Sequence, residues 1–307
     1  MTFNPLSPST QNQTPLAIYQ AKIGFELIED PAQAQAVLAL DKLYQQIIGR
    51  TDAQPLKGLY LWGDVGRGKT FLMDLFFDAL PQQGKLRLHF HRFMARVHQA
   101  LKEHAGQRDP LKLIAKNLAQ ECKVLCFDEF FVSDITDAMI LGTLMELLFA
   151  RGITLVATSN IEPDGLYRNG LQRARFLPAI ALIKKYTQTI NVDSGIDYRL
   201  RTLEQAEIYH FPLDAQAETN LLQYFNALSV EPRQEAVQVE VGNRKLNTRY
   251  EADGIVWFSF HELCETARSQ YDYMELSRCY HTVLLSGVKA MGRQNDDVAR
   301  RFIALVD

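Results

Sequence analysis

Apolar residues recur along the first two thirds of the chain in two alternating patterns. Five short, largely apolar runs have the length of buried strands and lie at residues 58–62, 86–91, 124–128, 154–158 and 189–192. Before and between them, apolar residues follow helical spacing, as in the stretches from about 31 to 47 and from about 134 to 151. Strands that alternate with helices in this way predict an α/β fold, with a mostly parallel sheet covered on both faces.

The pattern changes after about residue 203. Valines alternate with polar residues from 237 to 241 and are followed by Gly242-Asn243, which predicts an antiparallel pair of strands. Ser259 and Glu262 have the spacing of a capping box, which predicts a helix through Arg268. We therefore expect a flexible, polar N-terminus over residues 1–15, a core domain over 16–200 and a smaller mixed α+β domain over 201–307.

Composition and charge narrow the class of protein. The 307 residues are enough for one large or two medium domains, and a hydrophobic content of 47% is ordinary for a globular protein. A net charge of −3 gives no general attraction to nucleic acid or to an anionic membrane. The start of the chain lacks the pattern of a signal peptide, and the most apolar long segment, 138–150, is too short to span a bilayer. We expect a cytoplasmic protein with no specific nucleic-acid partner.

The segment after the first predicted strand has the spacing of a phosphate-binding P-loop. Its glycines let backbone N–H groups turn toward phosphate oxygens, Lys69 supplies a positive charge near the β and γ phosphates, and the Thr70 hydroxyl can ligate Mg²⁺. A strand before the loop and a helix after it are the context that the motif requires. The predicted nucleotide-binding residues are Gly63, Asp64, Val65, Gly66, Arg67, Gly68, Lys69, Thr70 and Phe71. The sequence therefore predicts that the chain binds a nucleoside triphosphate.

Two further strands end in residues that suit hydrolysis. Asp128 and Glu129 follow four apolar residues, at the edge of an open α/β sheet where ligands gather. We expect Asp128 to hold Mg²⁺ through its water shell and Glu129 to activate the attacking water. A kinase acting on a bound acceptor does not need such a glutamate, so the pair favours hydrolysis. Asn160, after the fourth strand, could sense the γ-phosphate or could form a turn ahead of Pro163.

Several arginines could complete the site. Arg168, Arg173 and Arg175 follow the fourth strand, where a guanidinium could stabilise charge on the γ-phosphate of a neighbouring subunit. Arg300 and Arg301 lie on the last predicted helix and could close onto the nucleotide, although each of these arginines could also be an ordinary surface residue. The histidine-rich stretch 87–104 reads either as a basic, aromatic-tipped surface for a partner or as a solvated helix face.

With these motifs established, the chain resembles the ZapE/AFG-type ATPases, a branch of the AAA+ superfamily. The resemblance is most specific at residues 58–63, 89–94, 127–135, 158–160 and 169–178. It implies a P-loop NTPase core of the AAA+ type with strand order 5-1-4-3-2, followed by a lid domain. It also implies Mg²⁺-dependent ATP hydrolysis, a homo-oligomer, and action on a tubulin-like cell division protein at the Z-ring, with membrane-proximal division proteins as further partners.

The resemblance also implies roles for single residues. Lys69 and Thr70 correspond to Walker A, Asp128 and Glu129 to Walker B, and Asn160 to sensor 1. Arg173 or Arg175 corresponds to the arginine finger, Arg300 or Arg301 to the lid sensor, and Gln33 to the adenine pocket. Members of this family continue beyond the position of Asp307, so we expect either a shortened lid or a C-terminal truncation.

Two other functions fit the same motifs. One is a nucleotide-gated adaptor that hydrolyses ATP slowly and acts through its bound state. The other is an AAA+ protein that loads another protein onto nucleic acid, which the acidic balance of the chain disfavours.

Overall fold

In the computed structural model, the described residues are 13–23, 30–50, 56–193, 195, 209–229, 233–241, 244–252, 254–280 and 282–307. The chain divides into two compact units, residues 1–201 and 202–307. Most of the N-terminal segment expected to be flexible lies outside the described residues, as do the turn at Gly242-Asn243 and residue 253.

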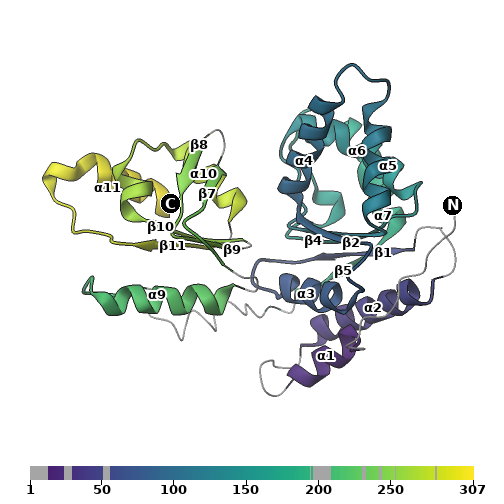
Figure 1. The fold of residues 1–307 in the computed structure, drawn as a ribbon, viewed down its shortest axis with the longest axis horizontal. Coiled ribbons are helices and arrows are strands. Elements are labelled where there is room, and N and C mark those ends of the chain that lie inside the picture. Colours follow the sequence, from purple (N-terminus) through teal and green to yellow (C-terminus); the bar gives the residue numbers. More distant parts are fainter. Residues whose placement is uncertain are drawn as a thin grey trace. The chain divides into compact units, whose positions relative to one another are not determined.

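The first unit is built on a sheet of five parallel strands (Figure 1). The strands are β1 (Gly58–Trp62), β2 (Lys85–His89), β3 (Val124–Asp128), β4 (Thr154–Ser159) and β5 (Thr187–Asn191). Their order is β2-β3-β4-β1-β5, so the predicted order 5-1-4-3-2 is confirmed. The second strand was predicted too far along the chain, because the observed strand ends at His89. A helix begins at the next residue and buries an apolar face that includes Phe90, Phe93 and Val97.

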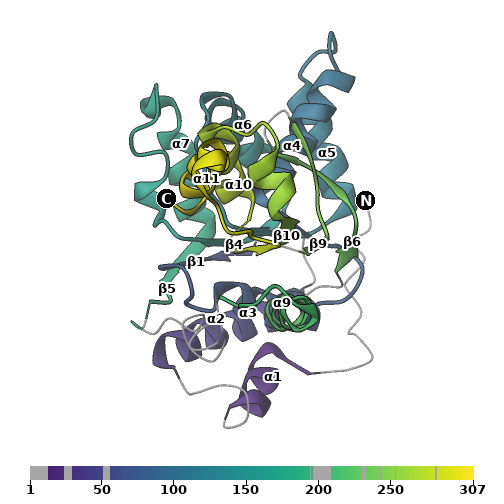
Figure 2. The same cartoon turned by 90° about the vertical axis from the view of Figure 1, so that its left-hand side faces the viewer.

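In the part of the first unit that the structure describes, seven α-helices cover the two faces of this sheet (Figures 1 and 2). On one face lie α1 (Pro15–Lys22), α2 (Pro31–Ile48) and α3 (Lys69–Ala79), and on the other lie α4 (Phe90–Glu103), α5 (Pro110–Glu121), α6 (Ile135–Phe149) and α7 (Leu177–Tyr186). Alternate strand residues serve the two layers: Leu61 and Cys126 pack with α2 and α3, whereas Tyr60 and Phe127 pack with α4 to α6. The sheet is therefore buried on both sides, which the near-continuous apolar strands predicted.

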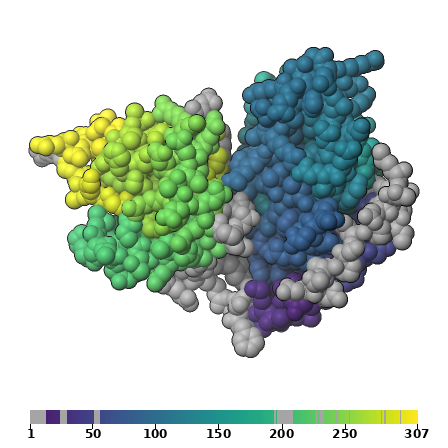
Figure 3. All heavy atoms as spheres, in the orientation of Figure 1, coloured from purple at the N-terminus to yellow at the C-terminus, as the bar shows by residue number. Residues whose placement is uncertain are grey.

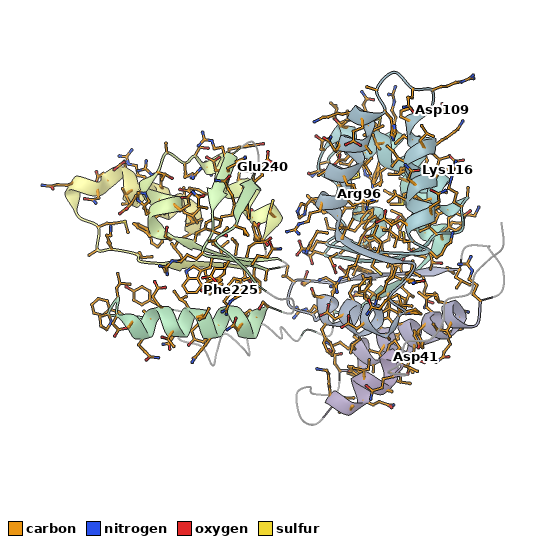
Figure 4. The ribbon with its side chains drawn as sticks, viewed as in Figure 1. Asp41, Arg96, Asp109, Lys116, Phe225 and Glu240 are labelled. Atoms are coloured by element: carbon orange, nitrogen blue, oxygen red, sulfur yellow. The ribbon has the colours of Figure 1, made fainter. Side chains whose placement is uncertain are left out.

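Carboxylates fix the starts of the helices that flank the candidate site. Asp30 caps α2, and its Oδ1 accepts N–H bonds from Ala32 at 2.8 Å and Gln33 at 3.3 Å. Asp134 caps α6 in the same way. Along α2, Asp41 accepts the Leu16 N–H at 3.1 Å and ties α1 to α2 (Figure 4). These bonds fix the starts of α2 and α6 and the contact between α1 and α2.

Residues of α4 and α5 lie at the surface of the first unit in the view of Figure 3, where they are coloured blue to blue-green. Phe93 and Val97 of α4 are buried beneath them, and Arg96 donates from Nη1 to Glu121 Oε1 of α5 at 3.0 Å (Arg96 is labelled in Figure 4). The basic face of α4 is thus partly neutralised by acids of neighbouring helices, since His98 also contacts Asp137 of α6 at 2.6 Å.

The second unit is a smaller α+β structure with a mixed sheet. Strands β6 (Gln234–Glu235), β9 (Tyr250–Ala252), β10 (Ile255–Ser259) and β11 (Thr282–Ser286) take the order β11-β10-β9-β6, and only the β10–β11 pair is parallel. Strands β7 (Gln238–Val241) and β8 (Arg244–Asn247) form the predicted antiparallel pair. Helix α9 (Ala215–Leu228) packs on one face, with α10 (Gln270–Cys279) and α11 (Asp296–Val306) on the other (Figures 1 and 2).

The helix predicted from Ser259 to Arg268 is wrong. Only a π-helical turn, His261–Glu265, forms there. Ser259 Oγ does accept the Glu262 N–H at 3.3 Å, but the Glu262 carboxylate binds Arg268 Nη2 at 2.7 Å and does not return to the helix start. The complete capping box lies later, where Ser269 and Asp272 open α10. Across the described parts of both units, no helix has the length and apolar character of a bilayer span.

We expect Gly58→Ala to destabilise the first unit by about 3 kcal/mol or more. A Cβ at this position in β1 would lie 1.8 Å from the Leu155 carbonyl oxygen of β4, and neither backbone can shift without breaking the sheet. Urea unfolding measures the loss. The matched control is Gly142→Ala within α6, where the new methyl has ordinary contacts and helix propensity predicts a gain of about 1 kcal/mol. Equal stability of the two variants would contradict the packing described here.

Candidate functional site

The phosphate loop joins the carboxyl end of β1 to the start of α3. Gly66 and Gly68 have φ angles of 82° and 77°, a left-handed conformation that glycine adopts without strain. Gly68 is the N-cap of α3, and a Cβ there would lie 2.5 Å from Gln33 Nε2. The loop therefore presents the N-terminus of α3, where backbone N–H groups and the helix dipole favour an anion.

Lys69, the first residue of α3, is folded over this loop. Its Nζ donates to the carbonyl oxygens of Gly63 at 2.6 Å and Asp64 at 2.7 Å. Thr70 follows on the same helix turn and is exposed. An ammonium and a hydroxyl therefore stand together at the helix start, which is the chemistry that a polyphosphate requires.

Two side chains hold the loop from outside. Arg67 Nε lies 2.8 Å from Asp193 Oδ1, just after β5. Gln33 of α2 is buried, and its Nε2 donates to the Arg67 carbonyl oxygen at 3.2 Å. Gln33 Oε1 is buried with no hydrogen-bond partner among the described residues. A buried acceptor left open beside the loop is costly unless a ligand satisfies it, and an adenine amino group has the matching donor.

Asp128, at the end of β3, is bound by a residue that the sequence analysis did not assign to the site. Arg87 of β2 donates from Nε to Asp128 Oδ2 at 2.6 Å and from Nη2 to Oδ1 at 3.2 Å. Its Nη1 donates to Asp74 Oδ1 of α3 at 2.5 Å. Burial raises the pKa of Asp74, against the effect of Arg87. Burial acts to lower the pKa of Arg87, but Asp128 and Asp74 more than offset this, and its net pKa is raised.

Glu129 follows Asp128 in a left-handed backbone conformation, with φ of 52°. The turn is held by β4: Glu129 N–H donates to Thr158 Oγ1 at 3.2 Å, and Phe130 N–H donates to the Thr158 carbonyl oxygen at 2.7 Å. The Glu129 side chain is 38% exposed, and its Oε2 lies 3.8 Å from His89 Nδ1. Left-handed residues other than glycine are uncommon and mark positions where the surroundings impose the backbone.

Asn160 and the two finger candidates lie in the segment that follows β4. Asn160 is exposed, directly after buried Ser159. Arg173 and Arg175 form the 3₁₀ turn Arg173–Arg175; Arg173 is partly buried and donates from Nη2 to the Asp164 carbonyl oxygen at 2.7 Å, whereas Arg175 is exposed. Tyr167 closes the same loop by donating to the Leu171 carbonyl oxygen at 3.0 Å.

Arg300 and Arg301 lie on α11, in the second unit. Arg301 donates from Nε to the Cys264 carbonyl oxygen and from Nη2 to Asp297, both at 2.6 Å, while Arg300 is exposed. Arg301 is therefore held within its own unit, and contact of either arginine with a nucleotide stays a prediction.

Arg87, Asp74 and Thr158 were not predicted from the sequence to belong to the site. For Arg87, the partner-surface interpretation is wrong, because its side chain is only 13% exposed and faces two carboxylates. The signal was present: polar residues at 85, 87 and 89 alternate with Leu86 and Leu88, so one polar face of β2 had to meet partners inside the sheet layer.

Comparison with known proteins identifies the family. The family model for AFG1-like ATPases matches residues 13–307, and the chain belongs to that family. It is 51% identical over 301 residues to the cell division protein ZapE of Escherichia coli K12, covering 91% of this chain and 80% of that protein. It is 39% identical over 269 residues to lactation elevated protein 1 homolog B of Danio rerio, covering 82% of this chain and 53% of that protein. The protein is thus an ATPase of the AAA+ type.

The donor set suits a magnesium ion that arrives with a nucleotide. Thr70 and Asp128 offer hard oxygen ligands, and Mg²⁺ is bound in proteins by one or two such ligands together with substrate phosphates and water. Among the described residues, no cluster of three or more His, Cys, Asp or Glu side chains could hold a metal ion alone. The residues present therefore fit a Mg²⁺ ion that shares its ligands with a polyphosphate.

We expect Thr158→Val to lower ATP turnover about tenfold with little change in ATP affinity. The variant keeps the shape of Thr158 but leaves the Glu129 N–H without its acceptor, a loss of roughly 1–3 kcal/mol at a strained position. Steady-state turnover and nucleotide titration separate the two effects. Thr136→Val, at an exposed hydroxyl of α6, is the matched control. A parallel loss of affinity would mean that Thr158 supports the whole loop and not Glu129.

Proposed function

We propose that the chain hydrolyses ATP with Mg²⁺ at the carboxyl edge of its parallel sheet. The observation that carries the proposal is the strand order, in which β4 lies between β1 and β3. The carboxyl ends of these three strands carry the phosphate loop, Asn160 and the Asp128-Glu129 pair. Ligands of open α/β sheets bind outside such an edge.

Each residue has a distinct task in this proposal. Lys69 leaves its loop carbonyls and donates to the β and γ phosphates, whose backbone contacts come from the N-terminus of α3. Thr70 and Asp128 hold Mg²⁺, which neutralises charge on the phosphates. Glu129 orients the attacking water and takes its proton, while Asn160 donates to that water or to the γ-phosphate. Gln33 Oε1 accepts from the adenine amino group.

The arginine finger in this proposal is Arg175, supplied by a second copy of the chain. Arg173 has its guanidinium bound to the Asp164 carbonyl oxygen, whereas Arg175 is exposed. Leu171 and Leu177, close to Arg175 in the sequence, are 71% and 45% exposed. An arginine flanked by exposed apolar side chains suits a protein interface. A homo-oligomer would place it against the γ-phosphate of its neighbour. Arg300 or Arg301 would act as the sensor from the second unit, which serves as a lid.

The biological role that we propose is in cell division, with a tubulin-like filament protein as the partner. The support is the 51% identity to a protein named for cell division. The chain would work in the cytoplasm and be recruited to the division site beside membrane-proximal division proteins. A slow nucleotide-gated adaptor is distinguished by turnover that does not rise when filaments are added, and a nucleic-acid loader by salt-dependent DNA binding.

Lys69→Ala should abolish ATP binding, whereas Glu129→Gln should keep ATP bound and stop turnover. The first change removes the positive charge at the phosphates, and the second removes the base for water. Nucleotide titration and phosphate release measure the two properties separately. Lys102→Ala, on the outer face of α4, removes a charge away from the loop and serves as the control. Hydrolysis retained in both site variants would refute the proposal. ATP-locked Glu129→Gln is then the bait for the filament protein.

Arg175→Ala should lower turnover by roughly 10³-fold while each subunit still binds ATP, since finger-assisted enzymes lose about this much. The test in trans mixes Arg175→Ala with Lys69→Ala. The first has an intact phosphate loop and the second an intact finger, so mixed assemblies regain turnover if the finger crosses between copies. Arg108→Ala, at an exposed loop arginine, is the control. Absence of recovery in demonstrably mixed assemblies would place the finger elsewhere.

A further inference from the structure

Arg87 lies at the centre of a buried charge cluster behind the phosphate site. Its three guanidinium nitrogens bind carboxylates of two elements, Asp128 at the end of β3 and Asp74 on α3. The three side chains are 13%, 4% and 13% exposed for Arg87, Asp128 and Asp74. The cluster therefore holds two carboxyl groups and one guanidinium.

The cluster is attached to both halves of the site. Asp74 lies one helical turn after Thr70 on α3, so a bond to Asp74 fixes the helix that carries Lys69 and Thr70. Asp128 is the last residue of β3, and Glu129 follows it directly. In the sheet, Arg87 pairs in register with Cys126, two residues before Asp128, and its side chain points to the face on which α3 packs. One guanidinium therefore sets the position of Asp128 relative to α3.

Asp128 can still accept further hydrogen bonds while it is bound to Arg87. Each carboxylate oxygen has two lone-pair directions, and Arg87 uses one on each oxygen of Asp128. The remaining directions can accept from water molecules around a metal ion. Direct ligation by Asp128 and Asp74 together is blocked, because the guanidinium already stands between the two carboxylates.

We infer that Arg87 is a positioning residue that occupies the place a divalent cation would take between Asp74 and Asp128, so that Mg²⁺ binds only when ATP brings phosphate oxygens to Thr70. This inference rests on the proposed function and adds an order of events to it. Two adjacent carboxylates in a poorly hydrated position would otherwise attract a hard cation by themselves. A metal held there would sit behind Asp128 and not at the phosphates.

Arginine suits this task better than lysine. A planar guanidinium can bind Asp128 through two nitrogens and Asp74 through a third, whereas a lysine ammonium is a compact point charge on a flexible stem. It also cannot lose its proton at any physiological pH. The cation between the carboxylates is therefore permanent.

The test is binding of Mn²⁺, used as a paramagnetic substitute for Mg²⁺, to the nucleotide-free protein. We expect wild-type protein to bind Mn²⁺ weakly, and Arg87→Gln to bind it about tenfold more tightly or better, because a positive charge beside the carboxylates is gone. Arg87→Lys should lie between the two. Adding Asp74→Asn to Arg87→Gln should return Mn²⁺ binding to the wild-type level. Arg108→Gln removes the same charge from an exposed loop and controls for net charge.

A structural role alone does not predict this pattern. If Arg87 only stabilised the fold, Arg87→Gln would lower the melting temperature without tightening Mn²⁺ binding, and the inference would be wrong. If Arg87→Gln does not fold, Arg87→Lys carries the test, since unchanged Mn²⁺ affinity in that folded variant would also overturn it. Titration of wild-type protein with Mg²⁺ and ATP is run in parallel. Failure of wild type to bind ATP would refute the proposed function, whereas normal ATP binding with unchanged Mn²⁺ affinities would refute only the inference about Arg87.

Discussion

The candidate site depends on one constraint, that parallel strands end at a common edge. Strand β4 lies between β1 and β3, so three loops far apart in the sequence begin side by side. The strand register brings the ends of the three strands close together, because Trp62 of β1 pairs with Ser159 of β4 and Phe127 of β3 pairs with Ala157 of β4. Helices on both faces bury the sheet, which leaves its edge as the place for polar side chains. The phosphate loop, Asn160 and the Asp128-Glu129 pair all come from this arrangement.

Much of the fold could be predicted because local pattern and global structure agree. Short apolar runs between helical segments located all five parallel strands, and the P-loop spacing located the turn between β1 and α3. The predictions failed where two local signals competed. At 86–91, the predicted strand extended past the start of the helix that begins at Phe90. At Ser259, the sequence has the spacing of a capping box but no α-helix follows, because the Glu262 carboxylate binds Arg268. Packing of the α4 helix against the sheet decided the first case, and a local ion pair decided the second.

The chemistry was less predictable than the fold. Asp128 and Glu129 could be recognised from a strand followed by two acids, but nothing local shows which cation faces them. Arg87 is 41 residues from Asp128 in the sequence, and its role depends on the adjacency of β2 and β3. In the same way, Thr158 acts on Glu129 only because β4 is the next strand. Residues that orient other residues are defined by contacts, and a single sequence does not contain the contacts.

The tip of β4 has a mechanical consequence. Thr158 and Ser159 hold the backbone at Glu129 and Phe130 through three hydrogen bonds, and Asn160 is the next residue along the same strand end. In the proposed mechanism, a contact between Asn160 and a bound γ-phosphate would act on the same strand end that holds the Glu129 backbone through Thr158. The end of β4 would then couple the presence of the γ-phosphate to the position of the Glu129 carboxylate.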